Sequence, residues 1–367
     1  MRRVEAGGPV DEILDRPIFV GGTGRSGTTV AGRLLNVHPQ LTLTRPRELR
    51  FIASALGVAE AYWTVTEGRI PRIKRTPPRN PLKRALRVAF PYPQKPSRVT
   101  PDLVVQSLWT HWFEREKPSG AVNGLSLALS RDALEAAAAS YLADFDSDPY
   151  VATRRFVAAV LAPQMAQQGG KRWVDTTPAN ARAADRMIAL FPDAKIVHMM
   201  RDGRDVAASF AGKKFGPNNV MVGLEAWRMR MLDAHRAELA VPEGTVIRID
   251  LQRLVVTHRQ ATLSRLLSCI DVPANPTFRQ WFAENISAKE AKPGRWRKDF
   301  SVDDCVLIDR RYGEILEELR AVGAPYPVRA DDSMRVQRLK RRREGSRRPA
   351  GPAESSSPEP ALPADDH

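Results

Sequence analysis

The chain has 367 residues, of which 43% are hydrophobic, so it is long enough to bury a core in one large domain or two small ones. Its formal net charge is +15, with 57 Lys and Arg residues against 42 Asp and Glu residues, and this surplus favours an anionic ligand without naming it. Two distant cysteines, Cys269 and Cys305, exclude a disulfide scaffold and a zinc ribbon and suit a reducing cytosol.

The N-terminal stretch MRRVEAGGPVDEILDRP has two arginines but no apolar run behind them, which argues against a signal peptide. The sequence contains no stretch of 18 apolar residues that would predict a membrane span. We therefore expect a cytoplasmic protein with a leader over residues 1–16 and a folded domain over residues 17–330. The Pro, Ser and charged composition of residues 331–367 predicts a disordered tail.

Between residues 17 and 330, short β-rich runs alternate with helical patterns. Strands are predicted in PIFVGG, KRWVDTT, AKIVHMMR and TVIRID, and the helices that follow them start near Gly27, Ala179, Arg204 and Leu251. The stretch from Phe278 to Val322 is predicted to be mostly helical. This alternation indicates a three-layer α/β fold of the P-loop-like type, with a central, mostly parallel sheet flanked by helices.

A basic, proline-rich insertion at about residues 65–101 interrupts this alternation. Between Val65 and Arg98, ten basic residues accompany one acid, Glu67, and PLKRALRVAF predicts one short basic helix. A second basic run, KRRREGSRR, begins near Lys340, where surrounding acids nearly cancel its charge. These runs leave open the hypothesis that the protein binds nucleic acid or an anionic surface. Both runs are, however, poor in the aromatic residues that stack on bases.

The first predicted strand leads into FVGGTGRSGTTVAGRLL, in which Gly22 and Gly27 have the spacing of a Walker A loop. Thr28 and Thr29 stand where such a loop carries Lys followed by Ser or Thr. An ATP-dependent kinase stays an alternative, weakened because the lysine that reaches the β- and γ-phosphates is missing. The glycines still let backbone N–H groups and a helix N-terminus meet an anion, and Arg25 adds a fork of donors.

This loop and the His38-Pro39 pair after its helix resemble the sulfotransferases that use 3′-phosphoadenosine 5′-phosphosulfate (PAPS), in particular the tyrosylprotein and carbohydrate branches and bacterial-type members. The resemblance implies that the 5′-phosphate and the adjoining sulfuryl group bind to Gly24, Arg25, Ser26, Gly27, Thr28 and Thr29. PAPS has no γ-phosphate and its transfer needs no metal. A loop without the Walker lysine therefore fits this donor, and we expect no metal site.

PAPS also carries a 3′-phosphate, and AKIVHMMRDGRDVAASF resembles the motif that holds it. A predicted strand ends at Arg201, a turn follows, and the next helix carries Ser209, eight residues after the arginine. The resemblance implies that Arg201 and Ser209 bind the 3′-phosphate, and Lys213, one turn later, is placed to reinforce them. The alternative is that Arg201 pairs with Asp202 at a helix start and Ser209 is an ordinary helix residue.

A late segment, KPGRWRKDF, resembles the loop with which sulfotransferases close over the nucleotide. The resemblance implies a nucleotide contact from Arg295 or Trp296, which lie between Gly294 and Arg297. Basic and aromatic loops are also common elsewhere, and the alternative is that Trp296 belongs to the core.

The candidate general base lies in the segment after the first predicted helix, LTLTRPRELRFI, just after a short predicted strand. Its Arg47-Glu48-Leu49-Arg50-Phe51-Ile52 element resembles the KExxFF-like stretch that carries a catalytic glutamate, which implies that Glu48 takes the acceptor proton. Arg25 is predicted to stabilise charge on the leaving phosphate, usually the larger contribution to the rate. The alternative for Glu48 is a surface ion pair with its neighbouring arginines.

One position departs from the family pattern, because Thr176 in RWVDTTPAN stands where many relatives carry a lysine that polarises the leaving group. Either Thr176 contributes only a hydroxyl, or activity is lower or absent, or the charge comes from Lys171, Arg172 or Arg47.

The acceptor is expected to be a hydroxyl of a metabolite, carbohydrate or glycolipid. Asp175 and Thr177 are predicted acceptor-side contacts, although Thr177 is at least as well placed to cap the following helix. We expect no nucleic-acid partner, and a peripheral contact of the basic insertion with an anionic membrane stays open. The sequence does not indicate an oligomeric state.

Overall fold

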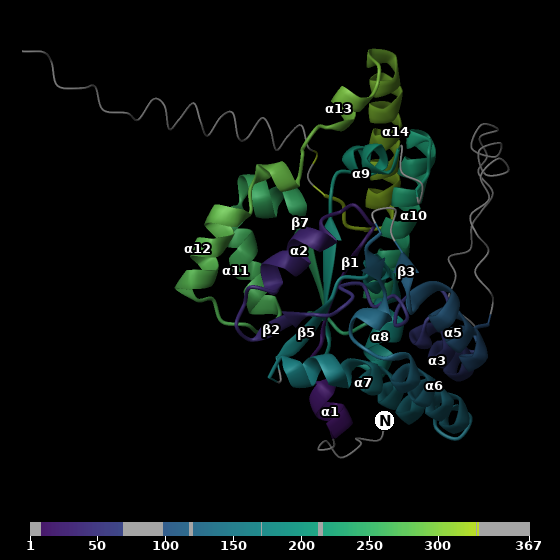
Figure 1. Ribbon diagram of the computed structural model, residues 1–367. Helices are drawn as coiled ribbons and strands as arrows, with labels where there is room; N and C mark the ends of the chain where they lie inside the picture. Colours follow the sequence, from purple (N-terminus) through teal and green to yellow (C-terminus); the bar gives the residue numbers. More distant parts are fainter. Residues whose placement is uncertain are drawn as a thin grey trace, which may run out of the picture.

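The structure is a computed structural model that describes residues 9–68, 98–116, 120–169, 171–211, 216–327 and 329. At its centre lies a five-stranded, all-parallel sheet with strand order β2-β5-β1-β6-β7 (Figure 1). Its strands are β1 (Ile18–Gly22), β2 (Leu41–Leu43), β5 (Arg172–Asp175), β6 (Lys195–Met200) and β7 (Val246–Asp250). A small antiparallel ladder joins β3 (Arg115–Glu116) to β4 (Val122–Asn123). The predicted α/β fold with a parallel sheet is confirmed.

Side-chain alternation along β1 builds a core on each face of the sheet, since successive strand residues point to opposite sides. Ile18 and Val20 belong to a hydrophobic cluster with α2 (Thr28–Leu35), α11 (Arg259–Cys269) and α12 (Pro276–Asn285). Phe19 points the other way and contacts the rings of Trp173 and Phe191 in a second cluster. Helices thus cover both faces of the sheet, which gives three layers (Figure 1).

Helix α7 (Pro149–Gln167) and helix α8 (Ala184–Leu190) pack in the cluster around Phe19. A third cluster joins α9 (Gly203–Phe210), α10 (Val220–Leu239) and α14 (Val302–Ala321). The remaining helical segments are α1 (Pro9–Ile13), α3 (Val58–Glu67), α5 (Pro101–Ser107), η1 (Leu108–Trp112), η2 (Leu125–Leu127), α6 (Arg131–Phe145), η3 (Pro178–Ala183), η4 (Arg253–Thr257), η5 (Ala288–Glu290) and α13 (Trp296–Asp299).

Two predicted helices begin differently from expectation. The helix expected from Ala179 starts as the 3₁₀ turn η3, because this segment packs directly on β1: a Cβ atom on Gly21 would lie 2.1 Å from the Ala181 nitrogen. The helix expected from Leu251 continues into the π-helical turn η4 and is interrupted before α11. The helices predicted between Phe278 and Val322 are present as α12, α13 and α14.

Helix α1 lies within the predicted leader and is fastened to the domain. Arg154 on α7 pairs with Asp11 over 2.7 Å, and Trp173 Nε1 donates to the Ile13 carbonyl oxygen over 2.8 Å. The predicted basic helix in PLKRALRVAF and the predicted tail lie outside the described residues. In the parts of the chain that the structure describes, every helix is too short or too polar to cross a bilayer.

Candidate active site

The carboxyl ends of the five parallel strands meet at one edge of the sheet, which is where open α/β folds bind their ligands. The predicted site residues at 24–29, 48 and 201–209 follow β1, β2 and β6, and residues 175–177 lie at the end of β5. The two predicted phosphate motifs lie on neighbouring strands, because β1 pairs directly with β6. The fold therefore brings both motifs to the same edge.

The loop between β1 and α2 turns tightly through left-handed backbone conformations. Gly24, Arg25 and Gly27 have φ angles of 78°, 57° and 103°. A Cβ atom on Gly22 would lie 2.3 Å from Ser26 Oγ, so glycine is required there as well. Glycine-rich turns of this kind expose backbone N–H groups to an anion, and the N-terminus of α2 adds its positive dipole end.

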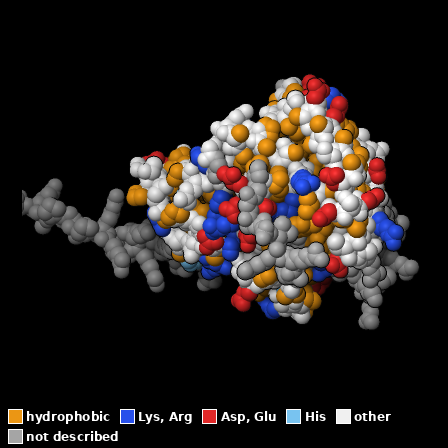
Figure 2. Space-filling model, turned by 90° about the horizontal axis from the view of Figure 1, so that it is seen from below, with side chains coloured by type: hydrophobic (Ala, Val, Ile, Leu, Met, Phe, Trp, Pro, Cys, Tyr) orange, Lys and Arg blue, Asp and Glu red, His pale blue; other side chains and the backbone are white. Residues whose placement is uncertain are grey.

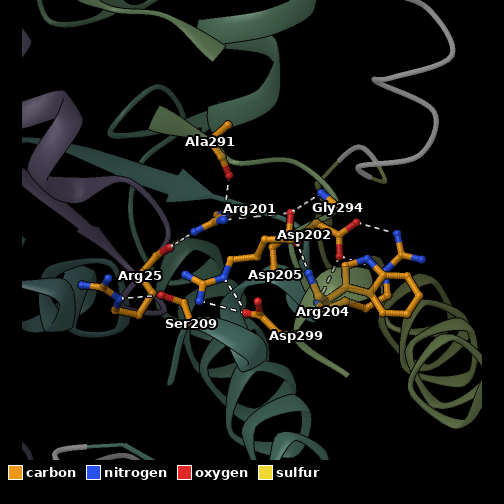
Figure 3. Close-up of polar contacts among 11 residues, drawn as sticks. Arg25, Arg201, Asp202, Arg204, Asp205, Ser209, Ala291, Gly294 and Asp299 are labelled. Carbon is orange, nitrogen blue, oxygen red and sulfur yellow. Dashed lines mark hydrogen bonds and ion pairs between the residues drawn. The ribbon is translucent and has the colours of Figure 1, made fainter. Parts of the chain in front are cut away.

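Arg25 connects this loop to helix α9. Its Nε atom donates a hydrogen bond to Ser209 Oγ over 2.9 Å (Figure 3). Arg201, directly after β6, donates from Nη1 to the carbonyl oxygen of Arg25 over 3.0 Å. The structure thus brings together three side chains that the sequence assigned to two separate phosphates. Lys213, predicted to reinforce this group, lies outside the described residues.

Arg201 is a buried cation with only 6% of its surface exposed. Burial lowers the pKa of its guanidinium, Asp205 and Asp202 oppose this change, and the charges of Arg295 and Arg25 add to it. The three arginines therefore lie close enough to disfavour one another's charge. An anion among them would relieve this repulsion, so the cluster is suited to a negatively charged ligand.

Two buried polar atoms beside this cluster have no hydrogen-bond partner among the described residues: Ser26 Oγ and Arg201 Nε. An unpaired buried polar group costs about 1–3 kcal/mol, so such groups usually mark a place that a ligand or a water completes. Ser26 belongs to the first predicted phosphate motif and Arg201 to the second. The residues present therefore fit a ligand that brings anionic oxygens to both motifs.

Asp205 fastens the late segment onto helix α9. Its carboxylate accepts hydrogen bonds from the backbone N–H groups of Gly294, over 3.0 Å, and Trp296, over 3.3 Å. Burial raises the pKa of Asp205 to about 6. Arg295 lies between these two anchored residues, and its Nε donates to Asp299 over 2.9 Å. The late segment is thereby held beside the arginine cluster (Figure 3).

Trp296 lies in the core, with 1% of its surface exposed. The Arg204 guanidinium packs over the rings of Trp296 and Tyr312, at 4.7 and 4.8 Å from their centroids. Arg204 also pairs with Asp202 through Nη2 and Oδ2 over 2.6 Å, and both side chains are fully buried. Asp202 thus pairs with Arg204, whereas the sequence suggested Arg201 as its partner. A nucleotide contact from Trp296 stays a prediction, while the observed ring packs inside the protein.

Glu48 lies after β2 on the wall of a groove. Its Oε2 atom accepts hydrogen bonds from Arg50 Nη2 over 2.7 Å and Nε over 3.1 Å, so the ion pair weighed from the sequence is present. The carboxylate is not covered by this pair: its side chain keeps 20% exposure and lines the groove. Among the described residues Oε1 accepts no hydrogen bond, which leaves it available for a proton. The role of Glu48 as base stays a prediction.

A buried carboxylate at the end of β5 holds the Glu48 segment in place. Asp175 Oδ1 accepts hydrogen bonds from the Leu49 backbone N–H over 2.8 Å and from Thr177 Oγ1 over 3.0 Å. Thr177 Oγ1 in turn accepts from the Arg50 backbone N–H over 3.1 Å. Burial raises the pKa of Asp175 to about 6. Both side chains are buried and position the segment from behind. Their contact with the acceptor stays a prediction.

Thr176 is buried as well and its hydroxyl is used inside the fold. Its Oγ1 donates to the Arg47 carbonyl oxygen over 2.9 Å, and its methyl group faces helix α2, where a Cβ atom on Gly32 would lie 2.5 Å away. Of the cations proposed to replace the family lysine, Lys171 and Arg172 lie at the start of β5, at the opposite end of the strand from the site. The exposed Arg47 is therefore the remaining candidate of the three.

Sequence reasoning missed one arginine at the loop. Arg230 on α10 donates from Nη1 to the Thr23 carbonyl oxygen over 2.5 Å and lies 5.3 Å from the centroid of the Phe210 ring. Nothing near Arg230 in the sequence marks it, because the contact depends on how α10 packs. No group of three or more His, Cys, Asp or Glu side chains within the described ranges is arranged to hold a metal ion.

Comparison with known proteins assigns the family. A model of the sulfotransferase family matches residues 90–276, just over half of the chain. The chain belongs to the sulfotransferase family. The matched part of this sulfotransferase contains β5, β6 and the Arg201–Ser209 motif, while the loop after β1 and Glu48 lie before it.

Several solved bacterial sulfotransferases are similar to this sulfotransferase. STF9 from Mycobacterium avium shows 15% identity and a TM-score of 0.43, with 87% of this chain and 80% of the other covered. STF1 from Mycobacterium tuberculosis H37Rv shows 20% identity and a TM-score of 0.41, with 83% and 78% covered. The sulfotransferase domain of the Synechococcus PCC 7002 olefin synthase shows 14% identity and a TM-score of 0.44, with 82% and 94% covered.

One curated relative of this sulfotransferase is an uncharacterized protein of Aquifex aeolicus, 26% identical over 134 residues. The matched region covers 35% of this chain and 18% of the relative. The chain thus matches less than a fifth of that protein's length.

Proposed function

We propose that this sulfotransferase uses PAPS and transfers the sulfuryl group to a hydroxyl of a metabolite, carbohydrate or glycolipid. The observation that supports PAPS as the donor is that Arg25, Arg201 and Ser209 lie together at the edge of the sheet. Beside them, Ser26 Oγ and Arg201 Nε are buried without hydrogen-bond partners among the described residues. PAPS carries anionic groups at both its 5′ and 3′ positions. Each motif contributes a guanidinium and a hydroxyl, which form strong charge-assisted hydrogen bonds with such groups.

In this proposal each of the two motifs binds a different anionic part of PAPS. The 5′-phosphosulfate end would be held by Gly24, Arg25, Ser26, Gly27, Thr28 and Thr29, and the 3′-phosphate by Arg201 and Ser209. The helix of the first motif starts at Thr28, which is buried, while Thr29 is exposed. Arg295 in the late segment adds a third positive charge next to Arg201.

When bound, PAPS supplies a sulfuryl group whose sulfur forms a bond to the acceptor oxygen as its bond to the bridging phosphate oxygen breaks, the electron pair staying on that phosphate. Glu48 takes the hydroxyl proton on its carboxylate, and Arg50 orients that carboxylate through the hydrogen bonds to Oε2. Arg25 stabilises the negative charge that develops on the phosphate, as a donor fixed in place before the reaction. Its bond to Ser209 and the left-handed backbone at Arg25 hold it there.

The alternatives weighed from the sequence gain no support from the described residues. A kinase needs the phosphate-binding lysine that Thr28 replaces. On the face at the bottom of Figure 1, basic and acidic side chains are interspersed (Figure 2), while the two basic runs on which nucleic-acid binding would depend lie outside the described residues. We therefore keep a small-molecule or glycan acceptor, no nucleic-acid partner and a cytoplasmic location as parts of the proposal. Membrane contact through the basic insertion concerns segments outside the described residues.

The direct test is calorimetric binding of 3′-phosphoadenosine 5′-phosphate, the nucleotide product, to the full chain. We expect a dissociation constant in the micromolar range or tighter for the wild type. Hydrogen bonds to charged groups contribute about 1.5–3 kcal/mol, so Arg25→Ala and Arg201→Ala should each weaken binding by about tenfold or more. Thermal unfolding of each variant checks that it is folded.

Arg155→Ala is the matched control, because Arg155 lies on α7, is 64% exposed at its side chain and pairs only loosely with Asp144 over 3.8 Å. It removes the same charge and should leave nucleotide affinity unchanged. Since Arg201 also ties backbone carbonyls together, Ser209→Ala provides a milder probe of the same phosphate site. Absence of nucleotide binding by the wild type would overturn the proposal.

A further inference from the structure

The groove beside Glu48 has a composition that indicates which acceptor it takes. It lies between the segment after β2, the end of η1 and the β3–β4 ladder. Its walls are formed by Pro46, Glu48, Leu49, Arg50, His111, Trp112, Arg115, Asn123, Gly124 and Leu125. We propose that this groove is the acceptor site and that Arg115 and Asn123 select an acceptor with an anionic group next to a hydroxylated ring.

The β3–β4 ladder places one basic and one amide side chain on the groove side. Arg115 and Asn123 are directly opposite each other in the antiparallel register. Opposed residues in such a pair point to the same face, whereas the next residue along the strand, Glu116, points to the other face. Consistent with this alternation, Arg115 and Asn123 line the groove while Glu114 and Glu116 do not. Arg115 therefore lines the groove, whereas its two acidic neighbours in the sequence, Glu114 and Glu116, lie outside the groove's lining.

The charges around the groove favour an anion. Glu48 is the only acidic side chain among its lining residues, and its charge is matched by the Arg50 guanidinium 2.7 Å away. Arg115 remains as an exposed positive charge with no hydrogen bond or ion pair to the described residues. A planar guanidinium next to an amide suits two-point recognition of a carboxylate or phosphate.

The groove encloses only about 20 Å³, so a ring that carries the reacting hydroxyl would lie across its open side against the other lining groups. Trp112 is half-buried, so part of its indole is open to the groove. Indole rings pack well against flat, partly apolar faces such as sugar or aromatic rings, and polar neighbours fix the orientation. With Glu48 on the same wall, an acceptor held by Arg115 and Trp112 lies next to the proposed base.

This inference rests on the proposed function, so its test includes a separate readout of the donor site. Transfer of ³⁵S from labelled PAPS is measured with three matched probes: 4-nitrophenyl β-glucoside, its β-glucuronide and its β-glucoside 6-phosphate. These differ only in the group at carbon 6, which is neutral, a carboxylate or a phosphate. The protein is the full chain as wild type, Arg115→Gln and Arg155→Gln, the last being a matched change of charge at an exposed residue outside the groove's lining.

We expect the wild type to use at least one anionic probe about tenfold better, in kcat/KM, than the neutral glucoside. Arg115→Gln should reduce this preference to near unity through KM, while calorimetry shows unchanged affinity for 3′-phosphoadenosine 5′-phosphate. Arg155→Gln should retain the preference. The probe that is favoured distinguishes a carboxylated from a phosphorylated acceptor.

Other outcomes separate the two proposals. A wild type that binds the nucleotide but prefers the neutral glucoside, uses all three equally or uses none overturns the acceptor assignment and leaves the donor proposal standing. An anionic preference that survives Arg115→Gln overturns the role of Arg115. A wild type that does not bind the nucleotide overturns both.

Discussion

The buried carboxylate of Asp175 makes the stability of the protein depend on pH in a way that a single substitution should remove. Its pKa is raised by burial from 3.8 to about 6, so the folded state holds a proton that the unfolded chain releases. Two pH units correspond to about 3 kcal/mol, so this group lowers the free energy of unfolding by about that amount as pH rises from below 4 to above 6.

The substitution Asp175→Asn keeps the shape of the side chain and removes the titration. Oδ1 of the new amide still accepts from Leu49 and Thr177, but its NH₂ group faces the Nδ2 atom of Asn180, which now donates to Asp175 Oδ2 over 2.7 Å. The Asn180 amide can rotate to present its unpartnered Oδ1 to the new NH₂ group, at the cost of the longer hydrogen bonds that its Nδ2 donates to the carbonyl oxygens of Val20 and Asp175, over 3.3 and 3.4 Å. The variant should therefore fold.

The assay is urea unfolding of wild type and variant at pH 4.5, 5.5, 6.5 and 7.5. The difference between their free energies of unfolding cancels contributions from other titrating groups, including Asp205. We expect the variant to gain on the wild type by about 2 kcal/mol across this range, most of it below pH 6.5, because part of the full effect falls below pH 4.5. Asp146→Asn, at an exposed position, should give a flat difference. Parallel curves for Asp175→Asn and wild type would refute the reasoning.

Three further changes probe the other parts of the site. Arg204→Ala removes the buried guanidinium that pairs with the fully buried Asp202 and should lower the free energy of unfolding by about 3–5 kcal/mol in urea titrations, whereas a loss under 1 kcal/mol would contradict this. Gly27→Ala adds a Cβ atom 2.9 Å from Leu251 at a φ of 103°, so we expect a loss of about 1–3 kcal/mol and weaker nucleotide binding by calorimetry. Glu48→Gln should keep nucleotide affinity and lower kcat by about 100-fold or more; an unchanged kcat would remove Glu48 as the base.

Local signals in the sequence predicted much of this architecture. The runs containing Ile18–Gly22 and Lys195–Met200 are strands because buried parallel strands are continuous apolar stretches, and each ends in a recognisable turn. Since parallel strands present their carboxyl ends at one edge, the sequence also implied that Arg25 and Arg201 lie near each other, as they do. The PAPS assignments of these residues stay predictions.

The unexpected features depend on long-range packing. Asp175 holds the backbone of Leu49, and Arg230 reaches Thr23, across distances in sequence that no local pattern reports. The resemblance of KPGRWRKDF to a nucleotide-closing loop implied a contact from Arg295 or Trp296, yet arginine and tryptophan together also build a core. Here Arg204 on α9 and Arg297 of the late segment both pack over the Trp296 ring, each 4.7 Å from its centroid.

Arg201 has a consequence for the dynamics of the protein. With one guanidinium it donates to the carbonyl oxygens of Arg25 and Ala291, which lie far apart in the sequence. Rotation of this one side chain would break both hydrogen bonds together. Opening of the loop after β1 is therefore coupled to opening of the stretch leading to Gly294. Amide protons in these two stretches should consequently exchange with solvent as a single cooperative unit.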